Sequence, residues 1–211
     1  MAEGSRNRRP RVVGLLVYSI VAAVDVVLAG AGRRRLRWLT KPALMPLLAA
    51  AEGRSADPLV VAGIGFSWLG DIALLYEGEG PFATGLAAFL AAHLSYIAAL
   101  SRRRSGGIRQ APALAASYAL AWLGLNVLLW SRSGRLRWPV AIYGSTLLIM
   151  ALAALDTGDP RATAGGAAFM ASDGLLALDV FGVAELPAAD SLVMATYTAA
   201  QALLALGARR D

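Results

Sequence analysis

The chain has 211 residues, of which 57% are apolar and only 16% are charged. A soluble domain averages about half apolar and about a quarter charged residues, so this composition excludes an ordinary soluble domain. The net charge of +6 lies in loops without interleaved aromatic residues, which argues against a nucleic-acid partner and is typical of basic loops beside anionic lipid.

Apolar runs with few charges follow one another along the chain, separated by short charged loops. Each long run approaches the roughly 20 residues that cross a bilayer as a helix. The backbone must satisfy its own hydrogen bonds in lipid, and the runs are apolar on all faces, so helices are predicted and a barrel is not. In chain order, the predicted spans are residues 12–30, 59–76, 82–100, 111–130, 138–155, 162–178 and 191–208.

The chain begins with a basic tail at residues 1–11. The tail resembles the first part of a signal peptide, but the following run, 12–30, exceeds the usual 7–15 residues of a signal core and carries Asp25. We therefore interpret this run as the first span. Residues 12–208 are predicted to form a single transmembrane helical domain.

The segment 38–51 is shorter and contains Pro42 and Pro46 one turn apart. It is either a short kinked span or a re-entrant piece sheltered by its neighbours. Counted as a span, it predicts an all-α bundle of about eight spans with both termini on one side. The excess of Lys and Arg on that side predicts cytoplasmic termini. A re-entrant segment would instead place the N-terminus outside.

Two aspartates lie midway along predicted spans, where an ionisable side chain is costly and indicates function. Asp71 follows Gly63 and Ser67 at helical spacing, on a face of small residues that lets another helix approach closely. Asp173 follows Gly166 on roughly one face in the same way. Two carboxyl groups that meet in one low-dielectric pocket would share a proton and form an acid–base pair. The alternative is that each aspartate only ties helices together.

Polar residues of two further spans are predicted to face the same interior. His93 and Tyr96 share a face of 82–100, and Tyr197 and Gln201 share a face of 191–208. His93 alternatively makes only a hydrogen bond between helices. It is the single histidine of a chain without cysteine, so no metal site is expected, and the sequence predicts no cofactor.

Lys41 is the only lysine of a chain that otherwise uses arginine. This choice indicates a need for a compact, titratable ammonium, which would bind a phosphate or pair with a buried aspartate. The alternative is a lysine at a span end that extends to the headgroups. Asp25 and Asp179 are predicted to be structural.

Four stretches of the chain contain most of the intramembrane polar residues described above, and their order along the chain is informative. They are Thr40-Lys-Pro-Ala-Leu-Met-Pro46, Phe66-Ser-Trp-Leu-Gly-Asp-Ile-Ala-Leu-Leu75, Gly85-Leu-Ala-Ala-Phe-Leu-Ala-Ala-His-Leu-Ser-Tyr96, and the pair Phe169-Met-Ala-Ser-Asp-Gly-Leu-Leu-Ala177 with Met194-Ala-Thr-Tyr-Thr-Ala-Ala-Gln201. In this order they resemble the YhhN-type family of membrane proteins, whose studied members are lysoplasmalogenases. The first span and residues 111–155 carry little of the resemblance.

The resemblance implies an eight-span bundle in the cell membrane. It also implies an enzyme that hydrolyses the vinyl ether bond of lysoplasmalogens to a fatty aldehyde and a glycerophospho-base, with a lysophospholipid as its substrate. The sequence does not define an oligomeric state.

This chemistry suits the residues. A vinyl ether is cleaved by protonating its β-carbon, after which water captures the oxocarbenium ion. Asp71 and Asp173 are predicted to supply the acid and the stabilising anion, by analogy with the two carboxylates of glycosidases. The supporting residues are predicted to be Lys41, His93, Tyr96, Tyr197 and Gln201.

Two other functions fit intramembrane aspartates. A proton-coupled transporter also uses buried Asp, Lys and His residues. An intramembrane aspartyl protease carries Gly-x-Gly-Asp followed by Pro-Ala-Leu, whereas here Trp68 stands in place of the first glycine and Pro42-Ala43-Leu44 precedes both aspartates. A purely structural membrane protein is the remaining alternative.

Overall fold

The computed structural model describes residues 8–53, 56–184 and 186–209, and this part of the chain contains helices and no strand. The expected all-α fold is therefore confirmed. Residues 1–7 of the expected basic tail lie outside the described residues. The long helices are α2 (Arg8–Gly30), α3 (Arg34–Glu52), α4 (Pro58–Ala73), α5 (Glu79–Leu100), α7 (Pro112–Trp130), α8 (Arg137–Asp156), α9 (Pro160–Val180) and α10 (Ala189–Gly207). The short elements are α6 (Gly107–Gln110) and the 3-10 turns Ser101–Arg103 and Gly134–Leu136.

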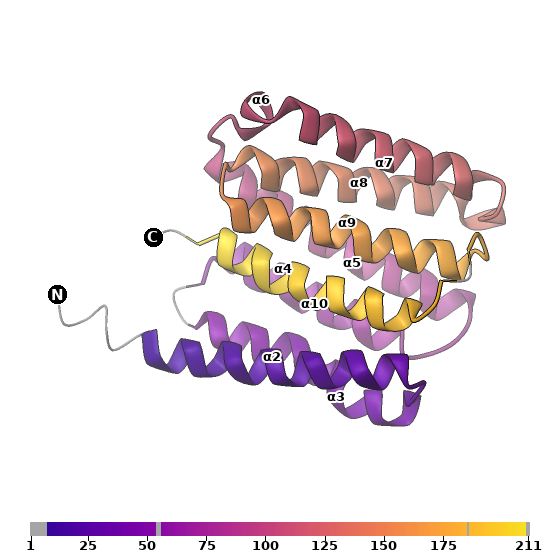
Figure 1. Cartoon of the computed structure of the whole chain (residues 1–211), viewed down its shortest axis with the longest axis horizontal. Coiled ribbons are helices and arrows are strands. Elements are labelled where there is room, and N and C mark those ends of the chain that lie inside the picture. The colour runs from indigo at the N-terminus through magenta and orange to yellow at the C-terminus, as the bar shows by residue number, and fades with distance from the viewer. Residues whose placement is uncertain (1–7, 54–55, 185, 210–211) are drawn as a thin grey trace.

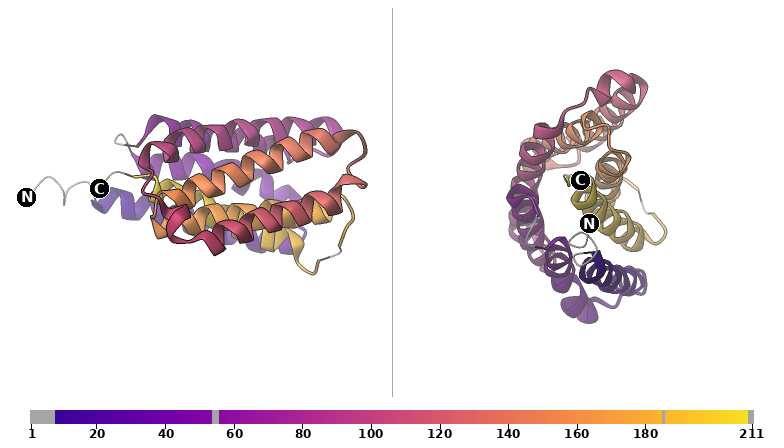
Figure 2. Two further views of the ribbon diagram at one scale, coloured as in Figure 1. Left: turned by 90° about the horizontal axis from the view of Figure 1, so that it is seen from above. Right: turned by 90° about the vertical axis from the view of Figure 1, so that its left-hand side faces the viewer.

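Successive long helices run up and down the bundle, so that α2 begins and α10 ends at the same end of the molecule (Figure 1). Viewed along the helices, α3, α4 and α5 belong to a curved outer layer (Figure 2). The last helix, α10, lies inside this curve, where it packs between α2 and α9. The helices α7 and α8 extend the bundle beyond α5, and α7 packs mainly on α8.

Length and composition allow five of the described helices to cross a membrane, namely α2, α5, α7, α8 and α10. The helix α4 is a shorter apolar helix. The helices α3 and α9 have 19 and 21 residues but are more polar. The polytopic helical bundle predicted from the sequence is confirmed, and the protein is a multi-pass integral membrane protein.

The segment expected as a short span or re-entrant piece belongs to the continuous helix α3, which runs from one end of the bundle to the other (Figure 1). A continuous helix of 19 residues favours the span over the re-entrant alternative. Pro46 has no N–H for the carbonyl oxygen of Pro42 four residues earlier, and the indole of Trp68 donates to that oxygen instead at 2.8 Å. A side chain from α4 thus replaces the backbone donor that Pro46 lacks, and the helix continues through both prolines.

The two helices that carry the central aspartates start in the same way. Asp57 caps α4 and Asp159 caps α9, and each is followed by a proline at the first helical position. Asp71 lies as many residues after its cap as Asp173 does, which is about 20 Å along the helix. Both helices begin at the same end of the bundle, so the sequence sets the two carboxyl groups at the same depth (Figure 1).

Glycine lets α4 and α5 approach closely. A Cβ atom on Gly63 would lie 2.7 Å from the ring of Tyr96, whereas one on Gly65 would meet nothing within 4 Å. We expect Gly63→Ala to lower the free energy of unfolding by about 1–3 kcal/mol through overpacking. Gly65→Ala on the same helix is the control and is expected to be neutral or slightly stabilising. Thermal unfolding in detergent compares the two, and equal stabilities would contradict this packing.

Candidate active site

One cavity of about 1110 Å³ opens among α3, α4, α5, α7, α8, α9 and α10. Its lining is mainly apolar. Four arginines line one end of the cavity, two of them at the start of α3 and two in the turn between α7 and α8. These arginines, here called the arginine mouth, are Arg34, Arg37, Arg132 and Arg135. The cavity is therefore amphipathic. Its end opposite the chain termini is charged and rich in arginine, with Glu77, Glu79 and Asp190 also in the lining, and its walls are apolar along its length.

Asp71 is 1% exposed and forms part of the cavity wall. Lys41 Nζ lies 3.5 Å from Asp71 Oδ1, and the hydroxyl of Tyr197 donates to Asp71 Oδ2 at 2.6 Å. Lys41 and Tyr197 also line the cavity. Both oxygens of Asp71 thus face a donor, one of them an ammonium, and this arrangement stabilises a negative charge at this position.

Tyr96 and Gln201, which were predicted to face the cavity, lie behind its wall. The hydroxyl of Tyr96 donates to Gln201 Oε1 at 2.6 Å, and Gln201 Nε2 donates to Ser67 Oγ at 2.8 Å. Both side chains are fully buried, and neither lines the cavity. Ser67 lies one turn before Asp71 on α4, so this chain of hydrogen bonds joins α5, α10 and α4 and fixes the position of Asp71 indirectly.

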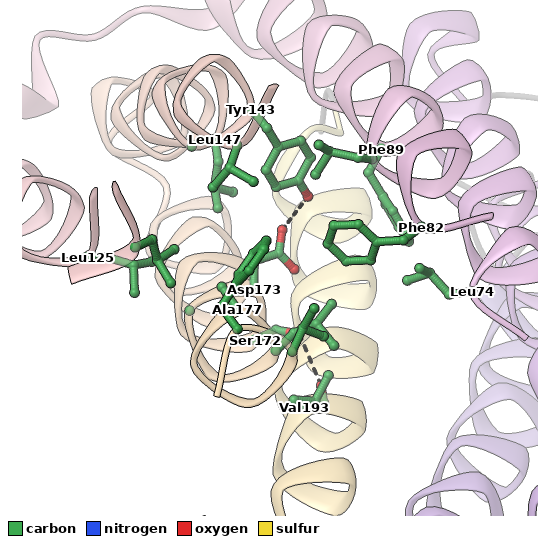
Figure 3. A pocket seen from close by; sticks show the side chains of 18 of the residues that line it. Leu74, Phe82, Phe89, Leu125, Tyr143, Leu147, Ser172, Asp173, Ala177 and Val193 are labelled. Atoms are coloured by element: carbon green, nitrogen blue, oxygen red, sulfur yellow. Dashed lines mark hydrogen bonds between the residues drawn. The ribbon is translucent and has the colours of Figure 1, made fainter. Parts of the chain in front are cut away.

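Asp173 lines the same cavity but has different partners. The hydroxyl of Tyr143 donates to Asp173 Oδ2 (Figure 3). Asp173 Oδ1 accepts no hydrogen bond from the described residues. Because the carboxyl group is partly exposed to the cavity, Oδ1 is available to a bound molecule.

His93 lies behind Tyr143 and does not line the cavity, so the prediction that it would face the cavity is wrong. His93 Nε2 is 3.0 Å from the hydroxyl of Tyr143 and 3.8 Å from Asp173 Oδ2. The single hydroxyl proton of Tyr143 points to Asp173, so this pattern assigns the Nε2 proton to His93, which donates to Tyr143. The imidazole is fully buried against Phe169 and does not line the cavity. It orients the tyrosine that holds Asp173.

Aromatic rings fill the space between the Asp71 and Asp173 clusters. Tyr197 meets Phe89 and Phe169 edge to face, at ring-centroid distances of 5.8 and 5.6 Å. Phe169 in turn contacts His93 at 4.7 Å. These rings lock the side chains that hold both carboxyl groups.

Asp25 and Asp179, which were predicted to be structural, do not line the cavity. Asp25 is fully buried, 3.4 Å from two guanidinium nitrogens of Arg37, and accepts a hydrogen bond from Thr40 at 2.5 Å. Asp179 is exposed in the last turn of α9 and does not line the cavity. Among the described residues, no group of three side chains suitable for a metal ion occurs.

Tyr143 was not identified from the sequence. It is a neutral residue in a region without any motif, and its role depends on the packing of α8 between α5 and α9. The arginine mouth was not identified from the sequence either. The sequence does show that these arginines bracket two different helical hairpins, but it does not show that the hairpins meet around one cavity.

Comparison with known proteins agrees with the resemblance found in the sequence. Residues 36–208 match the model of the YhhN family. The lysoplasmalogenase TMEM86B of Mus musculus is 37% identical over 166 residues, which are 78% of this chain and 70% of the mouse protein. The lysoplasmalogenase TMEM86A of Bos taurus is 29% identical over 162 residues, 71% of this chain and 64% of the bovine protein. No solved structure matches the chain significantly. The family match covers well over half of the residues, and the chain therefore belongs to the YhhN family.

Proposed function

We propose that this chain is a lysoplasmalogenase, which hydrolyses the vinyl ether bond of a lysoplasmalogen to a fatty aldehyde and a glycerophospho-base. The observation that carries the proposal is the pair of carboxyl groups with unlike partners in the wall of one amphipathic cavity. The similarity to enzymes named lysoplasmalogenases supports the same reaction.

The partners of the two aspartates suggest how the reaction is divided between them. Asp173 has one donor at Oδ2, the hydroxyl of Tyr143, and a free Oδ1, so it serves as the acid that protonates the β-carbon of the vinyl ether. Asp71, beside the ammonium of Lys41, serves as the carboxylate that stabilises the oxocarbenium ion and orients the attacking water. Water adds to the cationic carbon and releases a proton that restores the acid form of Asp173, and the neutral hemiacetal collapses to the aldehyde and the free glycerol hydroxyl.

The charge distribution of the cavity orients the substrate. A lysophospholipid has a phosphate at one end, a glycerol ether in the middle and one alkyl chain. The arginine mouth fits the phosphate, since guanidinium groups bind phosphate in a bidentate manner. The ether then lies at the depth of the two carboxyl groups, and the alkyl chain extends into the apolar part of the cavity.

Lys41 contacts Asp71, which favours the role of a counter-ion over that of a phosphate ligand. We expect Lys41→Arg to lower aldehyde release by at least about tenfold although it retains the charge, because a planar guanidinium does not fit the place of a compact ammonium. Initial rates with purified protein test this. Full activity of Lys41→Arg would reduce Lys41 to a generic positive charge.

We infer that the termini face the cytoplasm and that the arginine mouth opens on the opposite face. The arginines on that opposite face include Arg34 and Arg37, which pair with Glu77 and Asp25, and such pairing weakens their influence on topology. The chain contains no cysteine, so labelling of a single introduced cysteine shows on which side of the membrane that position lies. A cysteine in the turn between α7 and α8 should react with a membrane-impermeant maleimide added outside intact cells, and protection there would reverse the orientation.

Product analysis with the purified protein tests the proposed function. We expect a lysoplasmalogen to give a free aldehyde and a glycerophospho-base, and the analogue with a saturated ether to give neither, because it has no vinyl carbon to protonate. Absence of aldehyde together with solute flux in proteoliposomes would favour a transporter instead.

A further inference from the structure

The cavity continues past the two carboxyl groups into a seam between α7 and α9. The helix α7 packs mainly on α8 and touches α9 little, so the seam is hollow. A Cβ atom on Gly174, next to Asp173, would lie 3.8 Å from Leu125, which places Leu125 at the depth of the carboxyl groups. Leu125 of α7 lines the cavity and lies on the other side of Asp173 from Phe82 and Leu74 (Figure 3).

Below Leu125, the cavity follows one face of α7 toward the end where the chain termini lie. The lining residues of α7 recur every three to four positions from Leu125 through Ala121 to Tyr118, a distance of about 10 Å along the helix. The facing residues of α9 are small or flexible, namely Ala167, Met170, Ala171 and Gly174. This part of the cavity, called here the α7–α9 arm, carries no charged residue among those that line it below Asp173.

A second hollow of about 440 Å³ lies beyond the arm in the same seam. The two hollows share Tyr118 and Ala167 as lining residues. Tyr118 is 6% exposed, and its hydroxyl donates to the carbonyl oxygen of Thr163 on α9 at 3.3 Å. The phenol ring therefore crosses the seam and separates the two hollows.

We propose that the α7–α9 arm binds the alkyl chain of the lysolipid and that Tyr118 forms its floor, which sets the chain length that the protein prefers. The proposal rests on the proposed function for the identity of the substrate. The order of surfaces along the cavity supports it, because an arginine-rich charged end is followed by the two carboxyl groups and then by an apolar arm. A molecule with one charged head and one apolar chain matches this order of surfaces.

Two substitutions should change the chain-length preference in opposite directions. Tyr118→Ala joins the two hollows, so longer chains gain buried surface. Ala121→Phe fills part of the arm, so longer alkyl chains bury less surface than in the unsubstituted protein. Two methylenes of buried chain correspond to about tenfold in affinity, so the ratio of kcat/KM between neighbouring members of a series that differs by two carbons should shift by about that factor.

Matched controls accompany each variant. Tyr118→Phe keeps the ring and removes only the hydroxyl, and it should leave the length profile unchanged. Leu120→Phe adds the same ring on the outer face of α7, where Leu120 is 67% exposed, and should also leave the profile unchanged. Ala121→Phe does not remove a buried side chain, so it tests the arm even if Tyr118→Ala fails to fold.

The experiment measures aldehyde release and, in parallel, binding of saturated ether lysolipids of the same chain lengths, which are not cleaved. Opposite shifts for Tyr118→Ala and Ala121→Phe in both series support the proposal. An unchanged profile in folded variants of an active enzyme would overturn it. Absence of aldehyde from the unsubstituted protein, with length-dependent binding that still shifts, would refute the proposed reaction and leave the chain-binding arm in place.

Discussion

Asp71→Asn and Asp173→Asn should each fold, insert and bind a saturated ether lysolipid, yet release aldehyde about 10²–10⁴-fold more slowly than the unsubstituted protein. Asparagine keeps the size and much of the hydrogen bonding of each site, since Tyr197 and Tyr143 still find an oxygen to accept their protons. It can neither deliver an acidic proton nor carry the negative charge that stabilises the cation. The double variant should be little worse than either single one, because groups that act as one unit are not additive.

Aldehyde release in detergent, with folding checked by thermal unfolding, measures this effect. Asp179→Asn is the matched control, since Asp179 is exposed on the same helix as Asp173 and outside the cavity lining. It should retain full turnover. If either Asp71→Asn or Asp173→Asn folds and retains near-normal turnover, the shared acid–base role of the two aspartates is wrong, and a transporter becomes the better interpretation.

Arg37→Met should lower the free energy of unfolding by about 3–5 kcal/mol, because it leaves Asp25 buried without its cation. Asp25 is completely buried, and Arg37 approaches both of its oxygens at 3.4 Å. After the substitution, Thr40 is the one remaining described partner of that carboxyl group. Chemical or thermal unfolding in detergent reports the loss independently of any effect on the arginine mouth.

The double variant Asp25→Asn/Arg37→Met separates a charge effect from a packing effect. It removes both charges, so the burial penalty disappears, and most of the lost stability should return. If the double variant is as unstable as Arg37→Met alone, the loss comes from the missing side-chain packing of Arg37, and the ion pair has no special role.

The sequence predicts the helical type of the long segments, because an apolar run in lipid must satisfy its own backbone hydrogen bonds. It misplaces the start of α3, because the arginines at 34–37 read as a loop. In the structure Arg37 is helical, and its charge is offset by Asp25 of the neighbouring helix. Such compensation depends on which helices pack together, and periodicity within one segment contains no information about it.

In the candidate site, too, single residues could be predicted from one segment, whereas contacts between helices could not. Asp71 and Asp173 could be identified from the sequence, because a carboxyl group within an apolar span costs free energy and therefore indicates a function. Their partners could not be assigned in this way. Tyr197 of α10 bonds to Asp71 of α4, and Tyr143 of α8 bonds to Asp173 of α9, so each contact joins helices whose pairing only the fold determines. His93 and Gln201 were expected in the wall and lie one layer behind it.

Isotope labelling of the products tests acid catalysis at the vinyl carbon most directly. In deuterated water, the released aldehyde should carry a single deuterium on the carbon next to its carbonyl group, because the acid donates to that carbon. In ¹⁸O water, the glycerophospho-base should contain no ¹⁸O, because water attacks the vinyl side of the ether oxygen. An aldehyde without deuterium, or ¹⁸O in the glycerol hydroxyl, would contradict protonation of the vinyl ether by the aspartates of this cavity.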